Sequence, residues 1–138
     1  VDTVLDVGCG GGLPSVPLAL LLPHVSVMGV DAVGKKAAFV NQVAIELGLK
    51  NLTARHARVE KMVGTWKAIT SRAFASLADF THLTMHLLAS DGRWLAMKGV
   101  VPEDEIAALP SNVKVLAIEK LVVPGLEEER HLIVLGKE

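Results

Sequence analysis

The sequence predicts an α/β protein, with a doubly wound, mostly parallel seven-stranded sheet that ends in an antiparallel hairpin. Short apolar runs alternate with amphipathic stretches over most of the 138 residues, as expected for a parallel sheet covered by helices on both faces. The last two apolar runs are separated only by a charged turn, so at least one strand is antiparallel. The length and a hydrophobic content of 51% predict one domain over residues 1–138.

The first elements surround a run of glycines. Thr3–Val7 is rich in β-branched residues and is expected to be the first strand. A short helix is expected over Ser15–Leu22, because Pro14 and Pro17 are compatible with the first turn of a helix, where N–H groups lack partners. Val25–Val30 is expected to be the second strand.

The clearest helix is expected over Lys35–Leu47. Its apolar residues recur at steps of three and four, and Gly48 is a natural stop. Leu52–Arg55 and Ala68–Ser71 are the third and fourth expected strands.

The remaining elements complete the sheet. A helix is expected over Leu77–Leu88, ended by a turn at Asp91-Gly92, followed by a fifth strand at Arg93–Met97. A short helix at Glu103–Leu109 precedes the hairpin, whose two strands, Val113–Val123 and His131–Leu135, flank the charged turn. One reversed strand near the edge of such a sheet is the Rossmann-like layout of class I methyltransferases, but a fold alone does not give a function.

Composition narrows the class of protein. The net charge of −1 is unlike that of a strongly basic nucleic-acid-coating domain. Cys9 is the only cysteine, so no internal disulfide can form, which fits a cytoplasmic location. The longest apolar run, Val16–Leu22, is far shorter than the roughly 20 residues of a membrane span. We expect no membrane association.

The glycine loop Asp6–Pro14 is the most informative segment. The dinucleotide fingerprint requires a third glycine where Leu13 stands. The pattern Gly8-x-Gly10-x-Gly12 after the acidic Asp6 instead looks like the loop that cradles the methionine part of S-adenosylmethionine. The alternative is a glycine-rich turn without a ligand. Cys9 is expected to be a small packing residue and not a nucleophile.

Two acidic residues follow later strands. Asp31 ends the second strand, where a carboxylate can accept both ribose hydroxyls of an adenosyl group. The alternative is an N-cap for the following helix. Glu60 follows the third strand, in the region that flanks the adenine in methyltransferases, with a solvated carboxylate at a helix start as an equal alternative.

From Val4 to Val134 the chain resembles the small-subunit ribosomal RNA guanine-N7 methyltransferases, RsmG or GidB. The glycine loop alone is typical of class I methyltransferases in general, whereas the runs at residues 71–77 and 95–99 are specific to the RsmG/GidB family. The motifs that carry the resemblance are Asp6-Val7-Gly8, Gly10, Gly12-Leu13-Pro14, Pro17-Leu18, Gly34-Lys35-Lys36, Glu46-Leu47-Gly48-Leu49, Arg58-Val59-Glu60, Ser71-Arg72-Ala73-Phe74-Ala75-Ser76-Leu77, Leu95-Ala96-Met97-Lys98-Gly99, Pro102-Glu103-Asp104-Glu105-Ile106 and Glu129-Arg130-His131-Leu132.

The resemblance implies an enzyme that transfers a methyl group from S-adenosylmethionine to N7 of a guanine in the 530 loop of 16S ribosomal RNA, with the RNA or the small subunit as partner. The cofactor-contact positions of the family match here at Gly8, Leu13, Val59, Glu60 and Arg72. Two loop residues depart from the family pattern: many members carry Thr or Ser at the position of Cys9, and Pro or Ala at the position of Gly11. The family also carries a helical segment of roughly sixty residues before the first strand, which this sequence does not contain.

Guanine N7 carries no proton, so its methylation needs no general base and catalysis can rest on orientation. Arg72, at the end of the fourth strand, is the residue expected to position the reactants, through the cofactor carboxylate, a guanine acceptor edge or a phosphate. A structural salt bridge is the alternative. Lys98 is expected to bind substrate. The other basic residues could form an RNA-facing patch together with Lys98, but solvated helix or strand ends are favoured for most of them. These residues are Lys35, Lys36, Arg55, Arg58 and Arg93. Histidine spacing predicts no metal site, and a monomer is expected.

Three other functions compete with this one. The family-specific runs at residues 71–77 and 95–99 argue against a methyltransferase with another substrate. A nicotinamide-dependent oxidoreductase is opposed by Leu13 and by the lack of a hydride-transfer acid or base. A non-catalytic RNA- or protein-binding module on the same fold is opposed by the combination of an intact loop with Asp31, Glu60 and Arg72.

Overall fold

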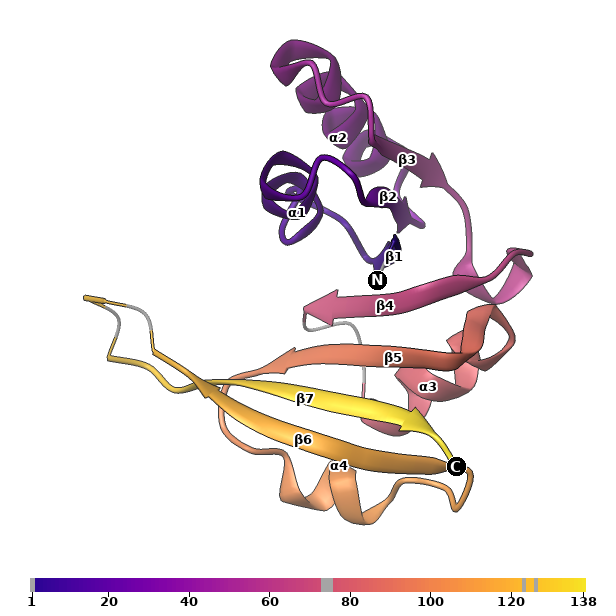
Figure 1. Cartoon of the computed structure of the whole chain (residues 1–138), viewed down its shortest axis with the longest axis vertical. Coiled ribbons are helices and arrows are strands. Elements are labelled where there is room, and N and C mark those ends of the chain that lie inside the picture. The colour runs from indigo at the N-terminus through magenta and orange to yellow at the C-terminus, as the bar shows by residue number, and fades with distance from the viewer. Residues whose placement is uncertain (1, 73–75, 123, 126) are drawn as a thin grey trace.

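The computed structural model describes residues 2–72, 76–122, 124–125 and 127–138. Seven strands and four helices, with two short 3-10 helices, make up this part of the chain (Figure 1). In chain order they are β1 Thr3–Val7, α1 Ser15–Leu21, β2 Ser26–Asp31, α2 Gly34–Leu47, β3 Leu52–His56, η1 Val59–Lys61, β4 Trp66–Arg72, α3 Leu77–Thr84, η2 Met85–Leu87, β5 Leu88–Lys98, α4 Glu103–Ala107, β6 Val113–Leu121 and β7 Arg130–Lys137.

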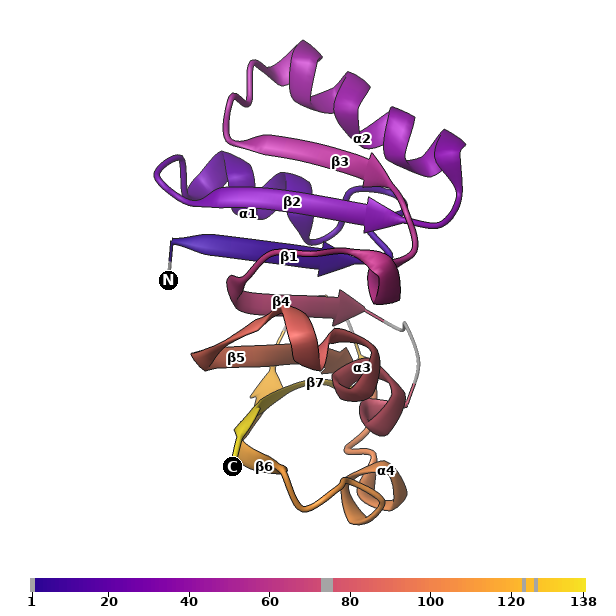
Figure 2. The same ribbon diagram turned by 90° about the vertical axis from the view of Figure 1, so that its right-hand side faces the viewer.

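One sheet contains all seven strands, in the order β3-β2-β1-β4-β5-β7-β6. The first five strands in chain order run parallel, and Figure 2 shows β3, β2, β1 and β4 stacked with their arrowheads on one side. β7 lies between β5 and β6 and is antiparallel to both. The predicted fold class is therefore confirmed, including the reversed strand near the sheet edge. Because β1 is central and the chain moves outward on either side of it, the carboxyl ends of β1 and β4 form the switch point.

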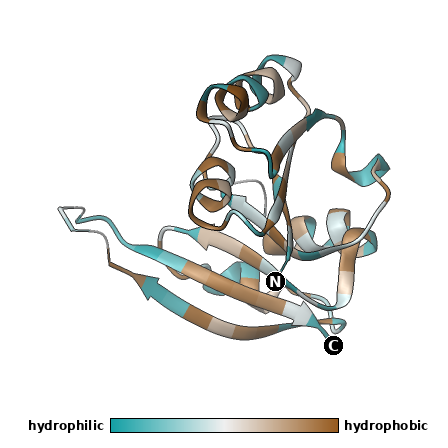
Figure 3. Ribbon diagram, turned by 45° about the horizontal axis from the view of Figure 1, so that its top comes forward, coloured by the Kyte–Doolittle hydropathy of each residue, from teal (hydrophilic) through white to brown (hydrophobic). Residues whose placement is uncertain are grey.

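Each face of the sheet has its own apolar core. On one face, α1 and α2 pack over β1–β3 through Ala19, Val40 and Ala44. On the other, α3 packs with Leu77 and Phe80 against the larger core around Trp94 and Ile133. Figure 3 shows apolar residues running along the strands, while α2 alternates between apolar and polar residues. α2 buries one side against the sheet, although its exposed side also carries apolar residues, among them Phe39 and Ile45.

The region between α3 and β5 differs from the prediction. The helix expected to reach Leu88 ends at Thr84 and tightens into η2. Asp91 and Gly92 are not a turn that ends the helix but lie inside β5, which begins at Leu88. Here the pairing with β4 shifts register, because Leu88 faces Trp66 whereas Arg93 faces Ala68. A Cβ at Gly92 would lie 2.9 Å from the Lys67 carbonyl oxygen, so glycine permits this bulge.

No helix in the described ranges is long and apolar enough to cross a membrane.

Candidate functional site

The candidate site lies at the carboxyl ends of the central strands, where the glycine loop connects β1 to α1. Two cavities of about 260 and 390 Å³ adjoin there. Val7, Gly8 and Asp31 line both of them. The two cavities therefore form one cleft, with Asp31 at the junction between its halves.

The glycine loop is held tightly against β2. The backbone N–H groups of Gly8 and Cys9 both donate to the carbonyl oxygen of Val30, at 2.8 and 3.1 Å. Gly8 and Gly12 adopt φ angles of 73° and 83°, which residues with a side chain rarely adopt. The loop thus turns sharply while its backbone stays open to the cleft.

Cys9 is part of the loop that lines the cleft, but its side chain packs in the core with Ala19 of α1. Its side chain is buried, and a Cβ at Gly29 would lie 2.8 Å from its sulfur atom. Burial raises the pKa of the Cys9 thiol to about 11, and the nearby charges of Asp6 and Asp31 act in the same direction. A thiol in this state is a poor nucleophile at neutral pH, which supports the interpretation of Cys9 as a packing residue.

The Asp31 carboxylate joins the loop to the start of α2. Its Oδ2 atom accepts a hydrogen bond from the Gly10 N–H at 3.0 Å, and its Oδ1 atom accepts one from the Val33 N–H at 2.9 Å. Asp31 does not cap α2, because the N-cap residue is Val33 and no side chain bonds there. Each carboxylate oxygen has two acceptor positions, so each retains one for a ligand in the cleft.

Asp6 lies behind the loop and not in the cleft. The Ser15 N–H donates to its Oδ2 atom at 3.2 Å, and the Thr70 hydroxyl donates to its Oδ1 atom at 3.2 Å. Burial raises the pKa of the Asp6 carboxyl to about 7, although these hydrogen bonds and the charge of Arg72 oppose the shift. Asp6 therefore fixes the start of α1 relative to β1 and β4.

The smaller half of the cleft is mostly apolar. Val30, Ala57 and Val59 contribute to its walls, and Glu60 lies at its edge. Glu60 is exposed in the first turn of η1, so both sequence-based interpretations of this carboxylate fit its position. The His86 ring bonds to the Met62 carbonyl oxygen at 3.1 Å, which ties the end of η1 to η2. A flat apolar group with a polar edge suits this half.

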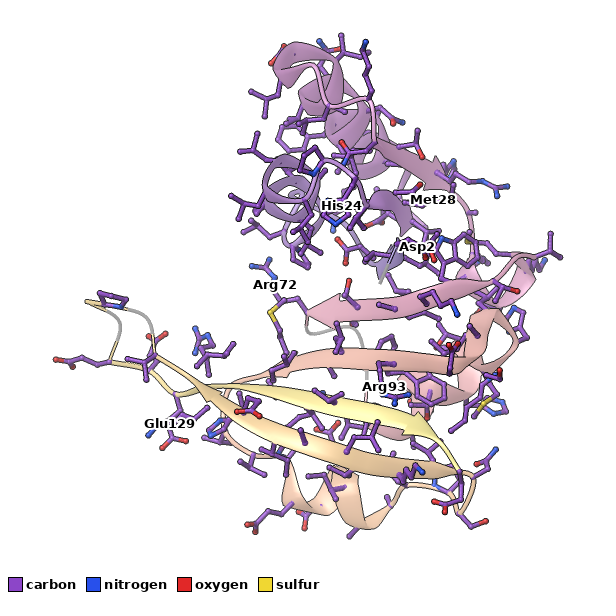
Figure 4. The ribbon with its side chains drawn as sticks, in the orientation of Figure 1. Asp2, His24, Met28, Arg72, Arg93 and Glu129 are labelled. Carbon is purple, nitrogen blue, oxygen red and sulfur yellow. The ribbon has the colours of Figure 1, made fainter. Side chains whose placement is uncertain are left out.

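The larger half is polar and carries two cations. The loop from Gly8 to Gly11, Leu13, Lys36 and Arg72 line it. Figure 4 shows Arg72 projecting from the end of β4. In the described ranges Arg72 forms no ion pair, which argues against the structural salt bridge considered as its alternative role.

Lys98 lies outside the residues that line the cleft. It is half-buried at the end of β5, and its Nζ atom pairs with the Glu105 Oε1 atom at 3.0 Å. The same Glu105 oxygen accepts the Leu77 N–H at 2.9 Å. This ion pair joins β5 to the starts of α3 and α4, and a role of Lys98 toward substrate stays a prediction.

The structure brings together most of the residues expected at the site. Gly8, Gly10, Leu13, Asp31, Val59, Glu60 and Arg72 all line the cleft. Of the other basic residues, Arg58 and Lys36 also line it, whereas Lys35, Arg55 and Arg93 do not. A solvated helix end was the favoured expectation for Lys36, although its place five residues after Asp31, in the first turn of a helix, was a usable signal for the cleft. Ala73–Ala75, in the middle of the run at 71–77, lie outside the described residues.

No group of three or more potential metal ligands was found among the residues described.

Known proteins similar to the chain agree on one family. The profile of the GidB family, described as rRNA small subunit methyltransferase G, matches residues 1–133. Proteins named ribosomal RNA small subunit methyltransferase G are 53% identical in Methylibium petroleiphilum and 50% identical in Aromatoleum aromaticum. These matches cover 98% and 99% of the chain, and 62% and 68% of the two relatives. The chain thus spans about three fifths of the length of many curated relatives.

Solved structures of low sequence identity share the fold. TrmN from Thermus thermophilus superimposes with a TM-score of 0.81 at 21% identity, over 99% of the chain and 44% of TrmN. Coclaurine N-methyltransferase, bound to N-methylheliamine and SAH, gives 0.77 at 12% identity, over 99% of the chain and 67% of that protein. At these identities the likeness concerns the fold alone.

Proposed function

Because the chain belongs to the GidB family of rRNA small subunit methyltransferase G proteins, we propose that it transfers a methyl group from S-adenosylmethionine to N7 of a guanine in the 530 loop of 16S ribosomal RNA. We propose the RNA, or the small subunit that contains it, as partner, and the cytoplasm as the place of action. The observation that carries the proposal is the divided cleft. On one side of Asp31 it is mostly apolar, with Arg58 and Glu60 as further charged residues, and on the other side it is polar and carries two cations.

The residues of the cleft fit the parts of this cofactor. The free acceptor positions of Asp31 suit the two ribose hydroxyls, and the apolar half beside Val59 and Glu60 suits the adenine. The open backbone of the loop suits the amino-acid end, whose carboxylate matches the planar fork of Arg72. When bound, the cofactor supplies an electrophilic methyl group.

The residues of the chain have a positioning task in this reaction. Guanine N7 presents a lone pair without a proton, so no side chain has to remove one, and the rate depends on alignment of the reacting atoms. Arg72 ends β4, and Met97 of β5 is its register partner. We propose that Lys98, the next residue of β5, contacts the substrate, with its ion pair to Glu105 fixing the position of the ammonium group.

Calorimetric titration tests the proposal most directly. We expect S-adenosylhomocysteine to bind the chain in the micromolar range, because the product retains every group that the cleft would hold. NADH is the matched control, since Leu13 stands where the dinucleotide fingerprint requires its third glycine. If the folded chain binds NADH, or does not bind S-adenosylhomocysteine, the proposal is contradicted.

Replacement of Arg72 by alanine is expected to weaken S-adenosylhomocysteine binding about tenfold or more, because a charge-assisted hydrogen bond contributes roughly 1.5–3 kcal/mol. Arg55→Ala is a suitable control, since Arg55 is also exposed at the end of a strand but does not line the cleft. Titration of both variants gives the comparison. Equal affinity and equal methyl transfer in Arg72→Ala and the parent chain rule out the positioning role.

A further inference from the structure

The polar half of the cleft is lined by more cations than carboxylates. Lys36 and Arg72 both line this cavity, and neither forms an ion pair within the described parts of the chain. Asp31 also lines this cavity and keeps its negative charge, since hydrogen bonds from backbone N–H groups do not neutralise a carboxylate, whereas Asp6 lies behind the loop and is not among the lining residues. Two cations and one carboxylate therefore line the polar half, and its net positive charge suits anionic ligands.

The fold itself places Lys36 at the cleft. The bond from Val33 N–H to Asp31 fixes the start of α2, and the Lys36 N–H donates to the Val33 carbonyl oxygen at 3.1 Å. Lys36 lies four residues before the buried Val40, so it borders the packed side of the helix. Lys35 lies on the opposite side of α2 and does not line the cavity.

The cofactor in the proposed function brings one carboxylate, whereas the cavity offers two cations. A guanidinium matches a carboxylate with two parallel hydrogen bonds, whereas an ammonium group acts as a point charge and suits a phosphate. No acidic residue occupies the first turn of α2 to offset the charge of Lys36. Lys36 is thus available to a second anion that arrives after the cofactor.

We propose that Lys36 binds a phosphate group of the substrate RNA next to the guanine that is methylated. This inference rests on the proposed function and adds a substrate contact to it. In this arrangement Arg72 holds the cofactor and Lys36 anchors the nucleotide chain at the mouth of the same cavity. The contact concerns the backbone of the RNA, so it contributes position and affinity without reading the base.

The test compares Lys36→Ala with Lys35→Ala and Lys36→Arg in the same chain. A fluorescein-labelled RNA hairpin with an unpaired guanine in its loop is titrated by anisotropy at several KCl concentrations, with saturating S-adenosylhomocysteine. For Lys36→Ala we expect weaker RNA binding, and a slope of log affinity against log salt that is smaller by about 0.7, because one phosphate contact is lost. Lys35→Ala is expected to keep the parent slope, and Lys36→Arg to restore most of the binding.

Titration of the variants with S-adenosylhomocysteine separates the possible failures. The inference requires Lys36→Ala to bind this ligand as tightly as the parent. A loss of cofactor affinity with an unchanged salt slope would assign Lys36 to the cofactor carboxylate and overturn the inference. Equal RNA binding by Lys36→Ala and Lys35→Ala, or no RNA binding by the parent chain, also overturns it. If the parent does not bind S-adenosylhomocysteine at all, the proposed function fails first.

Discussion

Asp6→Asn is expected to stabilise the protein at pH 8 much more than at pH 5. The Asp6 carboxyl has a pKa of about 7 in the folded protein because it is buried, against 3.8 for the ordinary side chain. Between these values the unfolded chain loses its proton while the folded protein keeps it, so stability falls as pH rises. Above about pH 7 both forms are ionised and the loss is complete, at most about 4 kcal/mol.

Asparagine cannot ionise, so it removes this loss of stability, while both hydrogen-bond partners of Asp6 stay bonded. Its oxygen can accept from the Ser15 N–H, and its amide can donate to the Thr70 hydroxyl, which can then donate to the Leu5 carbonyl oxygen. Urea unfolding of Asp6→Asn and the parent between pH 4 and pH 8 measures the effect as the difference between the two proteins at each pH.

Asp91→Asn is the control for this comparison. Asp91 is exposed, and its hydrogen bond to Lys67 lowers its pKa. The stability that this pair contributes is present above the ordinary pKa and is lost only in acid, so Asp91→Asn should show no change between pH 5 and pH 8. A difference between Asp6→Asn and the parent that does not vary with pH would mean that the Asp6 carboxyl titrates normally.

Asp31→Ala is expected to weaken S-adenosylhomocysteine binding by about a hundredfold or more. The variant loses the two acceptor positions proposed for the ribose hydroxyls, and hydrogen bonds to a charged group are worth roughly 1.5–3 kcal/mol each. It also frees the N–H groups of Gly10 and Val33 that hold the loop and α2 in place. Calorimetric titration measures the loss of affinity.

Glu60→Ala serves as the comparison for Asp31→Ala. Glu60 lines the same cavity but is exposed in η1, so its removal should cost much less affinity. If Asp31→Ala binds as tightly as the parent while its melting temperature is unchanged, then the ribose does not lie against Asp31. A larger loss in Glu60→Ala than in Asp31→Ala would place the main polar contact on the adenine side.

Local sequence patterns were sufficient for most of the secondary structure. The three- and four-residue steps of α2 and its stop at Gly48 depend only on neighbours along one helix. They are confirmed through Ala37, Val40 and Ala44, whereas Leu47, which continues the pattern, is exposed. The pattern failed at Leu88–Gly92, because that segment joins β5 through pairing with β4 and the close approach of Gly92 to Lys67. The hydrophobic pattern of a single segment does not reveal whether that segment pairs with a strand far away in the sequence.

The fold class, the family and four residues that line the cleft, Gly8, Asp31, Glu60 and Arg72, could all be predicted from the sequence. These follow from glycine and carboxylate positions at strand ends, which parallel strands bring to one edge. Three features became visible only in the folded chain: Lys36 shares the polar cavity with Arg72, Lys98 pairs with Glu105, and the Asp6 carboxyl is buried. Which partner a charged side chain meets, and how far it is removed from water, depend on segments far apart in the chain that become neighbours only on folding.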